Sequence, residues 1–216
     1  MNIQGACQKR VVGCYALLSM RAKIPIFRDC PNKRIARPLR CKLTQSQSAN
    51  MEKVGIFFGS STGNTESAAE AIKGLLGNAE LFNVADTKAA KMAEFTNLII
   101  GTSTWGVGDL QDDMEGFVSD MASVDLKGKK VALFGLGDQS SYGDTYCDGM
   151  GKVYQALQGK GCDVIGFMPT AGYEFDASVA VDGGEFVGLA LDADNQGEKT
   201  DERIKTWVAK IQKEFK

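Results

Sequence analysis

The sequence predicts an α/β fold in which a doubly wound, five-stranded parallel sheet carries helices on both faces. From residue 51 onward, short apolar runs alternate with segments of helical spacing, as repeated strand–helix units require. One run, the Asn-Leu-Ile-Ile-Gly-Thr of residues 97–102, is apolar on both sides. Such a run is typical of a central parallel strand, because both of its faces are buried.

The predicted elements follow in regular order from the start of this region. A buried strand at 53–58 comes first, because its apolar run lies between polar and glycine signals. A helix over 65–76 follows it, since apolar residues recur there at helical spacing. The remaining elements are a strand at 80–83, a short helix near 88–94, the strand at 97–102, a helix at 114–121, a strand at 131–135, a helix that includes 151–159, a strand at 163–168 and an amphipathic helix at 201–215 with Thr200 as its N-cap.

One stretch interrupts this order. Between Met168 and Phe186 lie 17 residues of mixed polar, glycine and aromatic character, and residues 186–191 then look again like a strand. An insertion that divides the last strand explains both observations. A loop this long in a compact domain has a role or is disordered.

The two ends of the chain differ in charge. Residues 1–50 hold ten of the 25 Lys and Arg and only one acidic residue, Asp29, which gives +9. Residues 51–216 hold the other 15 basic residues and 26 acidic ones, which gives −11. We therefore predict a targeting leader at 1–50, disordered and cleaved, before a folded domain at 51–216. A basic arm that binds nucleic acid or membrane is the alternative, disfavoured because aromatic residues do not alternate regularly with the basic ones.

Residue types exclude several functions. The apolar stretch at 11–20 is too short to span a bilayer, so no membrane insertion is expected. Outside the leader only Cys147 and Cys162 remain, at no metal-ligand spacing, which favours a reducing compartment and no metal site. The sequence contains no His, which excludes imidazole catalysis and His-ligated metals.

The loop after the first predicted strand suits a phosphate monoester. Residues 59–65 read Gly-Ser-Ser-Thr-Gly-Asn-Thr and open into a helix, so hydroxyls and backbone N–H groups are available as donors. Gly63 permits close approach or a positive φ. The loop lacks Lys and Arg, with Asn64 where a Walker-type loop has Lys, and no GxGxxG motif is present. These features favour the terminal phosphate of FMN over ATP or NAD, the alternative being a Ser/Thr-rich helix cap.

Two further loops each place an aromatic residue among glycines, Trp105 in 102–109 and Tyr142 in 135–144. Both loops follow the carboxyl ends of predicted parallel strands, where ligands bind in open α/β sheets. Two rings on neighbouring loops can clamp a flat heterocycle, with about 0.5–1.5 kcal/mol per stacked pair beyond burial. The alternative is that each ring closes the edge of the core.

These three loops resemble the FMN loops of flavodoxins in spacing and order, through residues 60–65, 104–106 and 137–142. Residues 172–173, 188–192 and 194–196 resemble the divided last strand of long-chain flavodoxins, and 203–207 resemble their final helix. The resemblance covers residues 52–216 and implies the sheet order 2-1-3-4-5. The resemblance implies no catalytic residues. Together with the chemistry of the loops, it implies that FMN is contacted by Ser60, Ser61, Thr62, Gly63, Asn64, Thr65, Ser103, Thr104, Trp105, Gly106, Val107, Gly108, Gly137, Asp138, Tyr142, Thr145, Tyr146, Cys147 and Asp148.

The resemblance implies a low-potential one-electron carrier, not an enzyme, whose non-covalent FMN shuttles between oxidised, semiquinone and hydroquinone states. Acidic residues cluster after both aromatic loops, which disfavours added negative charge on the flavin and steers the protein to basic partners. The implied partners are photosystem I and ferredoxin–NADP reductase, with the carrier acting as a monomer in place of ferredoxin. The basic leader suggests an algal precursor of the chloroplast stroma, with the mitochondrion as the alternative.

Two other classes of protein share the expected architecture. An FMN-dependent NAD(P)H:quinone reductase on the same fold would need oligomer contacts and a nicotinamide pocket, and no sequence feature indicates either. A response-regulator receiver would need an acidic cluster after the first strand and a Lys after the fifth. Those positions hold Ser60-Ser61 and Pro169-Thr170 instead, so the hypothesis of a receiver domain is rejected.

Overall fold

The computed structural model describes residues 52–216, so the predicted leader lies outside the described residues. The elements in chain order are β1 (Val54–Phe58), α1 (Asn64–Leu76), β2 (Ala79–Asn83), the 3-10 helix η1 (Ala89–Glu94), β3 (Asn97–Trp105), β4 (Asp109–Leu110), α2 (Asp112–Met121), β5 (Lys130–Leu136), η2 (Gly143–Thr145), α3 (Asp148–Leu157), β6 (Asp163–Ile165), β7 (Met168–Pro169), β8 (Val181–Asp182), β9 (Glu185–Phe186), β10 (Leu189–Leu191), η3 (Gly197–Lys199) and α4 (Thr200–Glu214).

The main sheet has the order β10–β5–β3–β1–β2, and these strands are parallel to their neighbours. Both β6 and β10 pair with β5: β6 lies along residues 130–132 of that strand and β10 along residues 134–136. They are therefore two halves of one strand position, separated in sequence by the insertion. This arrangement confirms the predicted doubly wound sheet of order 2-1-3-4-5 with a divided last strand.

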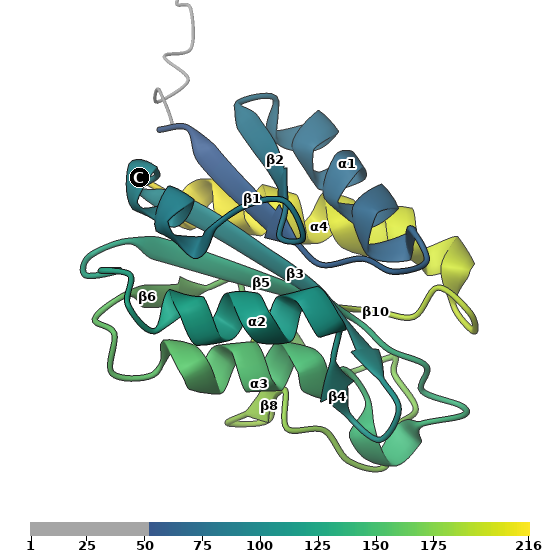
Figure 1. Ribbon diagram of the computed structural model, residues 1–216. Coiled ribbons are helices and arrows are strands. Elements are labelled where there is room, and N and C mark those ends of the chain that lie inside the picture. The colour runs from purple at the N-terminus through teal and green to yellow at the C-terminus, as the bar shows by residue number, and fades with distance from the viewer. Residues whose placement is uncertain (1–51) are drawn as a thin grey trace, which may run out of the picture. The chain divides into compact units, whose positions relative to one another are not determined.

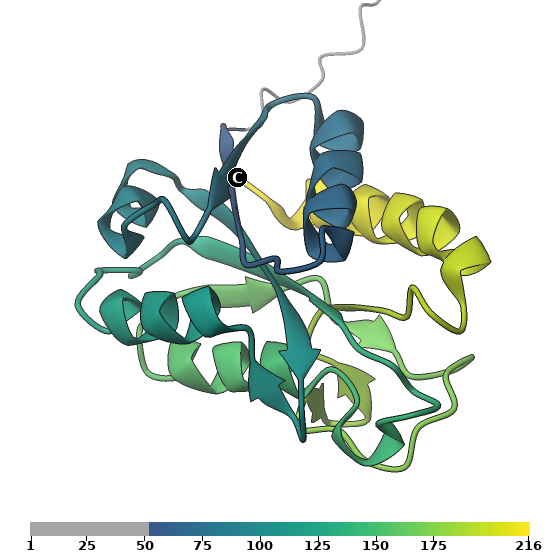
Figure 2. The same ribbon diagram turned by 45° about the vertical axis from the view of Figure 1, so that its right-hand side comes forward.

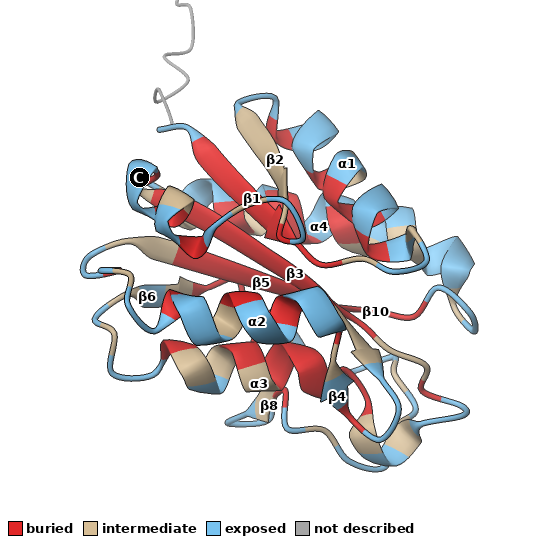
Figure 3. Cartoon of the chain, viewed as in Figure 1, coloured by how far each residue is buried: buried red, intermediate tan, exposed pale blue. Residues whose placement is uncertain are grey.

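Helices cover both faces of the sheet, with α1 and α4 on one side and α2 and α3 on the other (Figure 1). Alternation along β5 shows how one strand serves both layers. Val131 and Leu133 belong to the core under α2 and α3, while Ala132 and Phe134 belong to the core under α1 and α4. The central strands β1, β3 and β5 are buried between helices whose outer faces are exposed, and the edge strand β2 is half-buried (Figure 3). The apolar run 97–102 is accordingly central, because β3 lies between β1 and β5.

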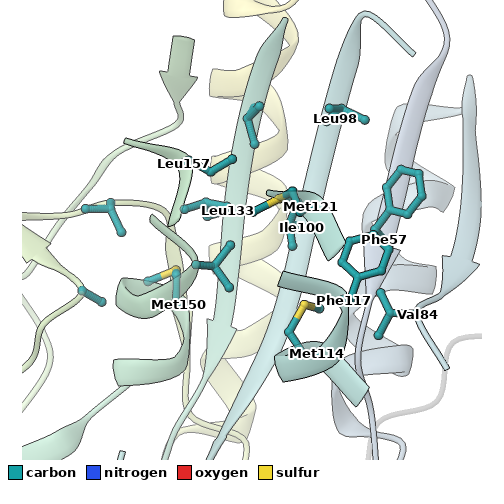
Figure 4. Packing of buried hydrophobic residues seen from close by; sticks show 14 of the residues in the cluster. Phe57, Val84, Leu98, Ile100, Met114, Phe117, Met121, Leu133, Met150 and Leu157 are labelled. Atoms are coloured by element: carbon teal, nitrogen blue, oxygen red, sulfur yellow. The ribbon is translucent and has the colours of Figure 1, made fainter. Parts of the chain in front are cut away.

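Aromatic and methionine side chains fill the core beneath α2. Phe57 of β1 stacks with Phe117 of α2 at a ring-centroid distance of 5.7 Å, and Met114 and Met121 of the same helix are fully buried nearby (Figure 4). Burying side chains of this size stabilises the fold by about 1.5–3 kcal/mol each. This packing fixes α2, and with it the loop that joins β3 to α2.

The third strand extends beyond its predicted end at residue 102. Its last residues form a hairpin with β4, in which Thr104 pairs with Leu110 and Trp105 pairs with Asp109 (Figure 2). The hairpin is not predicted from the sequence, because the glycines between the two strands look like irregular loop. It holds Trp105 on a paired strand rather than on a free loop tip.

The predicted N-cap of α4 is wrong. Thr200 already has helical dihedral angles, φ −57° and ψ −50°, and neither it nor Lys199 makes a side-chain capping bond. The physical reason is that the turn η3 runs directly into α4, so Thr200 lacks the non-helical backbone that an N-cap residue needs.

Within residues 52–216, the helices lack the combination of length and apolar character needed to cross a membrane.

The insertion between β6 and β10 is ordered and folds onto the loop after β5. Strands β7, β9 and β8 form a small antiparallel sheet, and Tyr173 and Phe175 pack their rings within 6 Å of the Tyr146 ring. Backbone bonds join the two segments, with Asp176 N donating to Gly143 O at 2.8 Å. The insertion therefore supports the segment that carries Tyr142.

Candidate functional site

A cavity of about 360 Å³ lies at the carboxyl edge of the main sheet. It is formed where the loops after β1, β3, β5 and β10 meet, the position at which open α/β sheets bind ligands. Polar residues and glycines line most of it, together with two aromatic rings. The lining residues are Thr62, Asn64, Thr65, Ser103, Thr104, Trp105, Gly106, Leu136, Gly137, Asp138, Tyr142, Thr145, Ala193 and Asp194.

One end of the cavity is the loop between β1 and α1. Gly63 has φ +91°, a conformation that glycine adopts without strain, and its N–H donates to Ser60 Oγ at 3.1 Å. In the described part of the chain, no hydrogen-bond partner exists for the backbone N–H groups of Ser61, Thr62, Asn64 and Thr65. Unpaired amides at a helix start, with the positive end of the helix dipole, suit an anion such as a phosphate.

The two aromatic side chains in the cavity are unusually exposed for their size. Trp105 is 42% exposed and Tyr142 is 50% exposed. The indole orientation is nevertheless fixed, because Trp105 Nε1 donates to Ser103 Oγ at 2.9 Å. Each ring therefore has a free apolar surface that a flat ligand would cover.

Thr145 supplies a hydroxyl without a partner. Its Oγ1 is buried and makes no hydrogen bond within the described residues, although Thr145 lines the cavity. A buried polar group left unsatisfied destabilises a protein by about 1–3 kcal/mol. A ligand that bonds this hydroxyl would remove that penalty.

Asp138 is an ionised carboxylate in the same wall. Its Oδ1 accepts from Ser140 N at 2.9 Å and from Ser141 N at 2.8 Å. Hydrogen bonds from Ser141 above all, together with those from Asn195 and Ser140, lower the pKa of Asp138 to about 2, because they favour its charged form. The cavity therefore has a fixed negative charge at neutral pH.

Asn195 joins the loop after β10 to this wall. Its Nδ2 donates to Asp138 Oδ1 at 2.8 Å and also to the carboxylate of the fully buried Asp192. Asp192 in turn accepts from Gln139 N at 3.1 Å. The amide thus bridges the carboxyl groups of Asp138 and Asp192, and it fixes the segment leading to Tyr142.

The structure brings many of the predicted site residues together. Those that line the cavity are Thr62, Asn64, Thr65, Ser103, Thr104, Trp105, Gly106, Gly137, Asp138, Tyr142 and Thr145. Five others lie in the same loops without lining it, and any contact they make with a ligand stays a prediction. These are Ser60, Ser61, Gly63, Val107 and Gly108.

Three predicted site residues have side chains that lie elsewhere. Tyr146 and Cys147 have no exposed surface, and any contact they make with a ligand stays a prediction. The turn before α3 directs both inward, and burial raises the pKa of Cys147 to about 12 and also raises that of Tyr146. Asp148, the first residue of α3, instead accepts from Val179 N of the insertion at 2.8 Å, and burial raises its pKa.

Some lining residues were not predicted. Leu136 ends β5, and Ala193 and Asp194 follow β10. The parallel arrangement of the last strand places these residues at the same edge as the other loops, so topology is the signal that could have found them. Among residues 52–216, no group of three His, Cys, Asp or Glu side chains could hold a metal ion.

The fold and this cavity define a doubly wound α/β protein with a ligand site at the carboxyl edge of its sheet. The family model "Flavodoxin" matches residues 56–207, and the chain belongs to the flavodoxin family. A flavodoxin from Synechocystis sp. is 49% identical over 164 residues, covering 74% of this chain and 96% of that protein. A flavodoxin from Helicobacter pylori is 44% identical over 165 residues, covering 76% of this chain and 99% of that one.

A solved structure agrees with the sequence relatives. The crystal structure of Fusobacterium nucleatum flavodoxin bound to flavin mononucleotide matches with a TM-score of 0.74 and 34% identity. The match covers 77% of this chain and 100% of that one.

Proposed function

We propose that this flavodoxin is a low-potential one-electron carrier that binds FMN without a covalent bond and is not an enzyme. The observation that carries the proposal is the set of groups around one cavity. Unpaired backbone amides lie at one end of it, and the half-exposed rings of Trp105 and Tyr142 line it. FMN has a phosphate at one end and a flat ring system at the other. When bound, FMN supplies the redox chemistry, and the chain supplies binding and electrostatics.

The residues present fit each part of FMN. The amides of residues 61, 62, 64 and 65 suit the phosphate, and the loop holds no Lys or Arg that a triphosphate site would need. Trp105 and Tyr142 offer apolar surface to the ring, and Thr145 Oγ1 offers a hydrogen bond. The ionised Asp138 disfavours further negative charge in the cavity, which lowers the reduction potential of a bound flavin.

Purification of the protein with its cofactor tests this function. The absorption spectrum, followed by acid release and mass measurement, should show one FMN per chain. A redox titration should resolve two separate one-electron steps. Release of FAD, or no flavin binding when apoprotein is mixed with FMN, would overturn the proposal.

We further propose a physiological route, in which the protein replaces ferredoxin between photosystem I and ferredoxin–NADP reductase. The excess of acidic residues in 51–216 supports it, because basic partners would be steered to such a surface. The acidic first turn of α2 follows directly on the Trp105 hairpin and so lies close to the cavity. Reduction of the bound flavin by NADPH and the purified reductase tests the route, and no reduction would contradict it.

We also propose that the protein is the precursor of a long-chain, plastid-targeted flavodoxin that acts as a monomer. The insertion between β6 and β10 supports the long-chain type, and the basic composition of residues 1–50 supports a leader. A chain that begins at Met51 should bind FMN as tightly as the full chain. An intact N-terminus on native protein would contradict removal of the leader, and import of a fusion into mitochondria would contradict the stromal address.

A further inference from the structure

A buried side-chain amide, Gln111, connects the loop after β1 with the start of α2. Gln111 is only 2% exposed. Its Oε1 accepts from Met114 N at 2.9 Å, which makes it the N-cap of α2. Its Nε2 donates to Ser61 Oγ at 3.3 Å and to Asp113 Oδ2 at 2.7 Å. One side chain thus satisfies a helix terminus and holds a residue 50 positions earlier in the chain.

The loop also packs tightly against this amide. Gly59 lies so close to Gln111 that a Cβ atom there would collide with Gln111 Oε1 and lie 3.1 Å from Met114 Cβ. On its backbone side, Gly59 N donates to Gly101 O of β3 at 3.0 Å. The first residues of the loop are therefore held between β3 and Gln111, directly before the unpaired amides of Ser61 and Thr62.

Capping alone does not explain a glutamine at this position. Asn, Asp and Ser are the preferred N-cap residues, because their short side chains reach the helix N–H groups well. Glutamine has one more methylene group, and here this length carries Nε2 across to Ser61 while Oε1 still caps the helix. The length of the side chain points to a second role on the loop side.

We propose that Gln111 is a positioning residue for phosphate recognition, which acts by holding Ser61 and so fixes the loop amides in the arrangement that receives the phosphate. The inference rests on the proposed FMN function. Gln111 does not line the cavity, so it acts through the loop and not by touching the ligand. A loop held in advance loses less conformational freedom on binding, and this advantage applies only to a ligand that engages the loop. Gln111 therefore favours FMN over riboflavin, which lacks the phosphate.

The variant Gln111→Asn separates the two roles. Asparagine is a good N-cap, but its shorter side chain cannot cap α2 and reach Ser61 together. We expect the affinity of the apoprotein for FMN to fall by about 3- to 10-fold, the size of one lost hydrogen bond, while the affinity for riboflavin stays unchanged. Fluorescence titration with both ligands measures the ratio of the two affinities, which a general loss of stability would not change.

Two matched variants complete the experiment. Ser61→Ala removes the other partner of the bond between Gln111 and Ser61. It should therefore lower the ratio of FMN affinity to riboflavin affinity by a similar factor, and the double variant should lower this ratio no further. Asp112→Ala changes the same helix turn at an exposed position and should leave the ratio unchanged. Because Ser61 is itself a predicted FMN contact, Gln111→Ser, which also caps a helix but cannot reach Ser61, replaces Gln111→Asn if that variant fails to fold.

The outcomes separate this inference from the proposed function. Equal losses for FMN and riboflavin, or an unchanged ratio in both Gln111→Asn and Ser61→Ala, would overturn the positioning role while FMN binding by the wild type stands. A wild-type apoprotein that binds neither FMN nor riboflavin would overturn the proposed function itself.

Discussion

Trp105 Nε1 donates a hydrogen bond of 2.9 Å to Ser103 Oγ, two residues earlier on β3. Residues two apart on a strand face the same side, so the serine lies within reach of the indole. The bond fixes the orientation of a ring that has 42% of its surface exposed and no stacking partner among the described residues. The ring is thus oriented before any ligand arrives, which lowers the entropy lost on binding.

Ser103→Ala should therefore weaken flavin binding through Trp105. We expect a loss of about 0.5–1 kcal/mol for FMN and for riboflavin alike, because the proposed role of the indole is to cover the ring system that both share. Titration of the apoprotein by flavin fluorescence measures both. In a Trp105→Phe background the serine has no indole to hold, so an equal effect of Ser103→Ala there would argue against this role.

Thr145→Val should separate stability from binding. Valine has nearly the same shape as threonine but lacks the hydroxyl that is buried without a partner in the described structure. The apoprotein should be as stable as the wild type or slightly more stable, whereas FMN affinity should fall by about 1 kcal/mol. Urea unfolding measures the stability of the apoprotein, and titration with FMN measures the affinity, so the two experiments test the two expected changes separately. Thr145→Ser, which keeps the hydroxyl, is the control for binding, and equal FMN affinity of the valine variant would contradict a bond to the ligand.

The parts of the site that could be predicted from sequence are those set by local pattern. A buried strand followed by glycines and hydroxyls predicts the loop at 59–65, and aromatic residues among glycines predict Trp105 and Tyr142. The bridges between loops could not be predicted in this way. Asn195 bonds Asp138 across 57 residues and Gln111 bonds Ser61 across 50, and side-chain contacts of that range leave no local signal.

The direction of side chains at the start of α3 was also beyond local pattern. Residues 145–148 look like one continuous loop in sequence, yet Thr145 lines the cavity while Tyr146 and Cys147 are buried. The backbone turns sharply there, since Cys147 has φ +55°, a value that residues other than glycine rarely adopt. Such a turn depends on packing against the insertion, where Tyr146 N donates to Ala177 O at 3.3 Å.

Asp138→Asn should change how the free energy of unfolding depends on pH in the acid range. The pKa of Asp138 is about 2 in the folded protein, below the ordinary value of 3.8, so its ionised form is favoured by folding. Its contribution is therefore complete at about pH 5 and is lost progressively as the pH falls from there towards 2. We expect the wild type to lose more stability than the asparagine variant between pH 5 and pH 3, on the order of a few tenths of a kcal/mol because solvent screens this carboxylate.

Urea unfolding of both apoproteins across that pH range measures the effect, and the difference between them removes the contribution of other carboxylates. A difference that does not vary with pH would show that the hydrogen bonds to Asp138 favour its charged form no more in the folded than in the unfolded chain.

Reversing charge at the start of α2 should slow the encounter with a basic redox partner. Asp112 and Glu115 are exposed in the first turn of α2, close to the Trp105 hairpin, and their replacement by Lys removes attraction at that surface. We expect a several-fold lower association rate with ferredoxin–NADP reductase at low salt and little change in FMN affinity. Asp113 is left in place, because its carboxylate accepts from Gln111.

Asp201 and Glu202 provide the matched control. They are exposed in the first turn of α4, so their reversal disturbs a helix dipole in the same way, but α4 covers the opposite face of the sheet (Figure 1). Stopped-flow rates at rising salt distinguish local steering from net charge, since exposed charges are screened beyond about 10 Å at 0.1 M. Steering at α2 requires that the α2 variant lose more rate than the α4 variant and that the gap close with salt. Equal losses at both helices would assign the effect to net charge alone, and docking near Trp105 would then have no support.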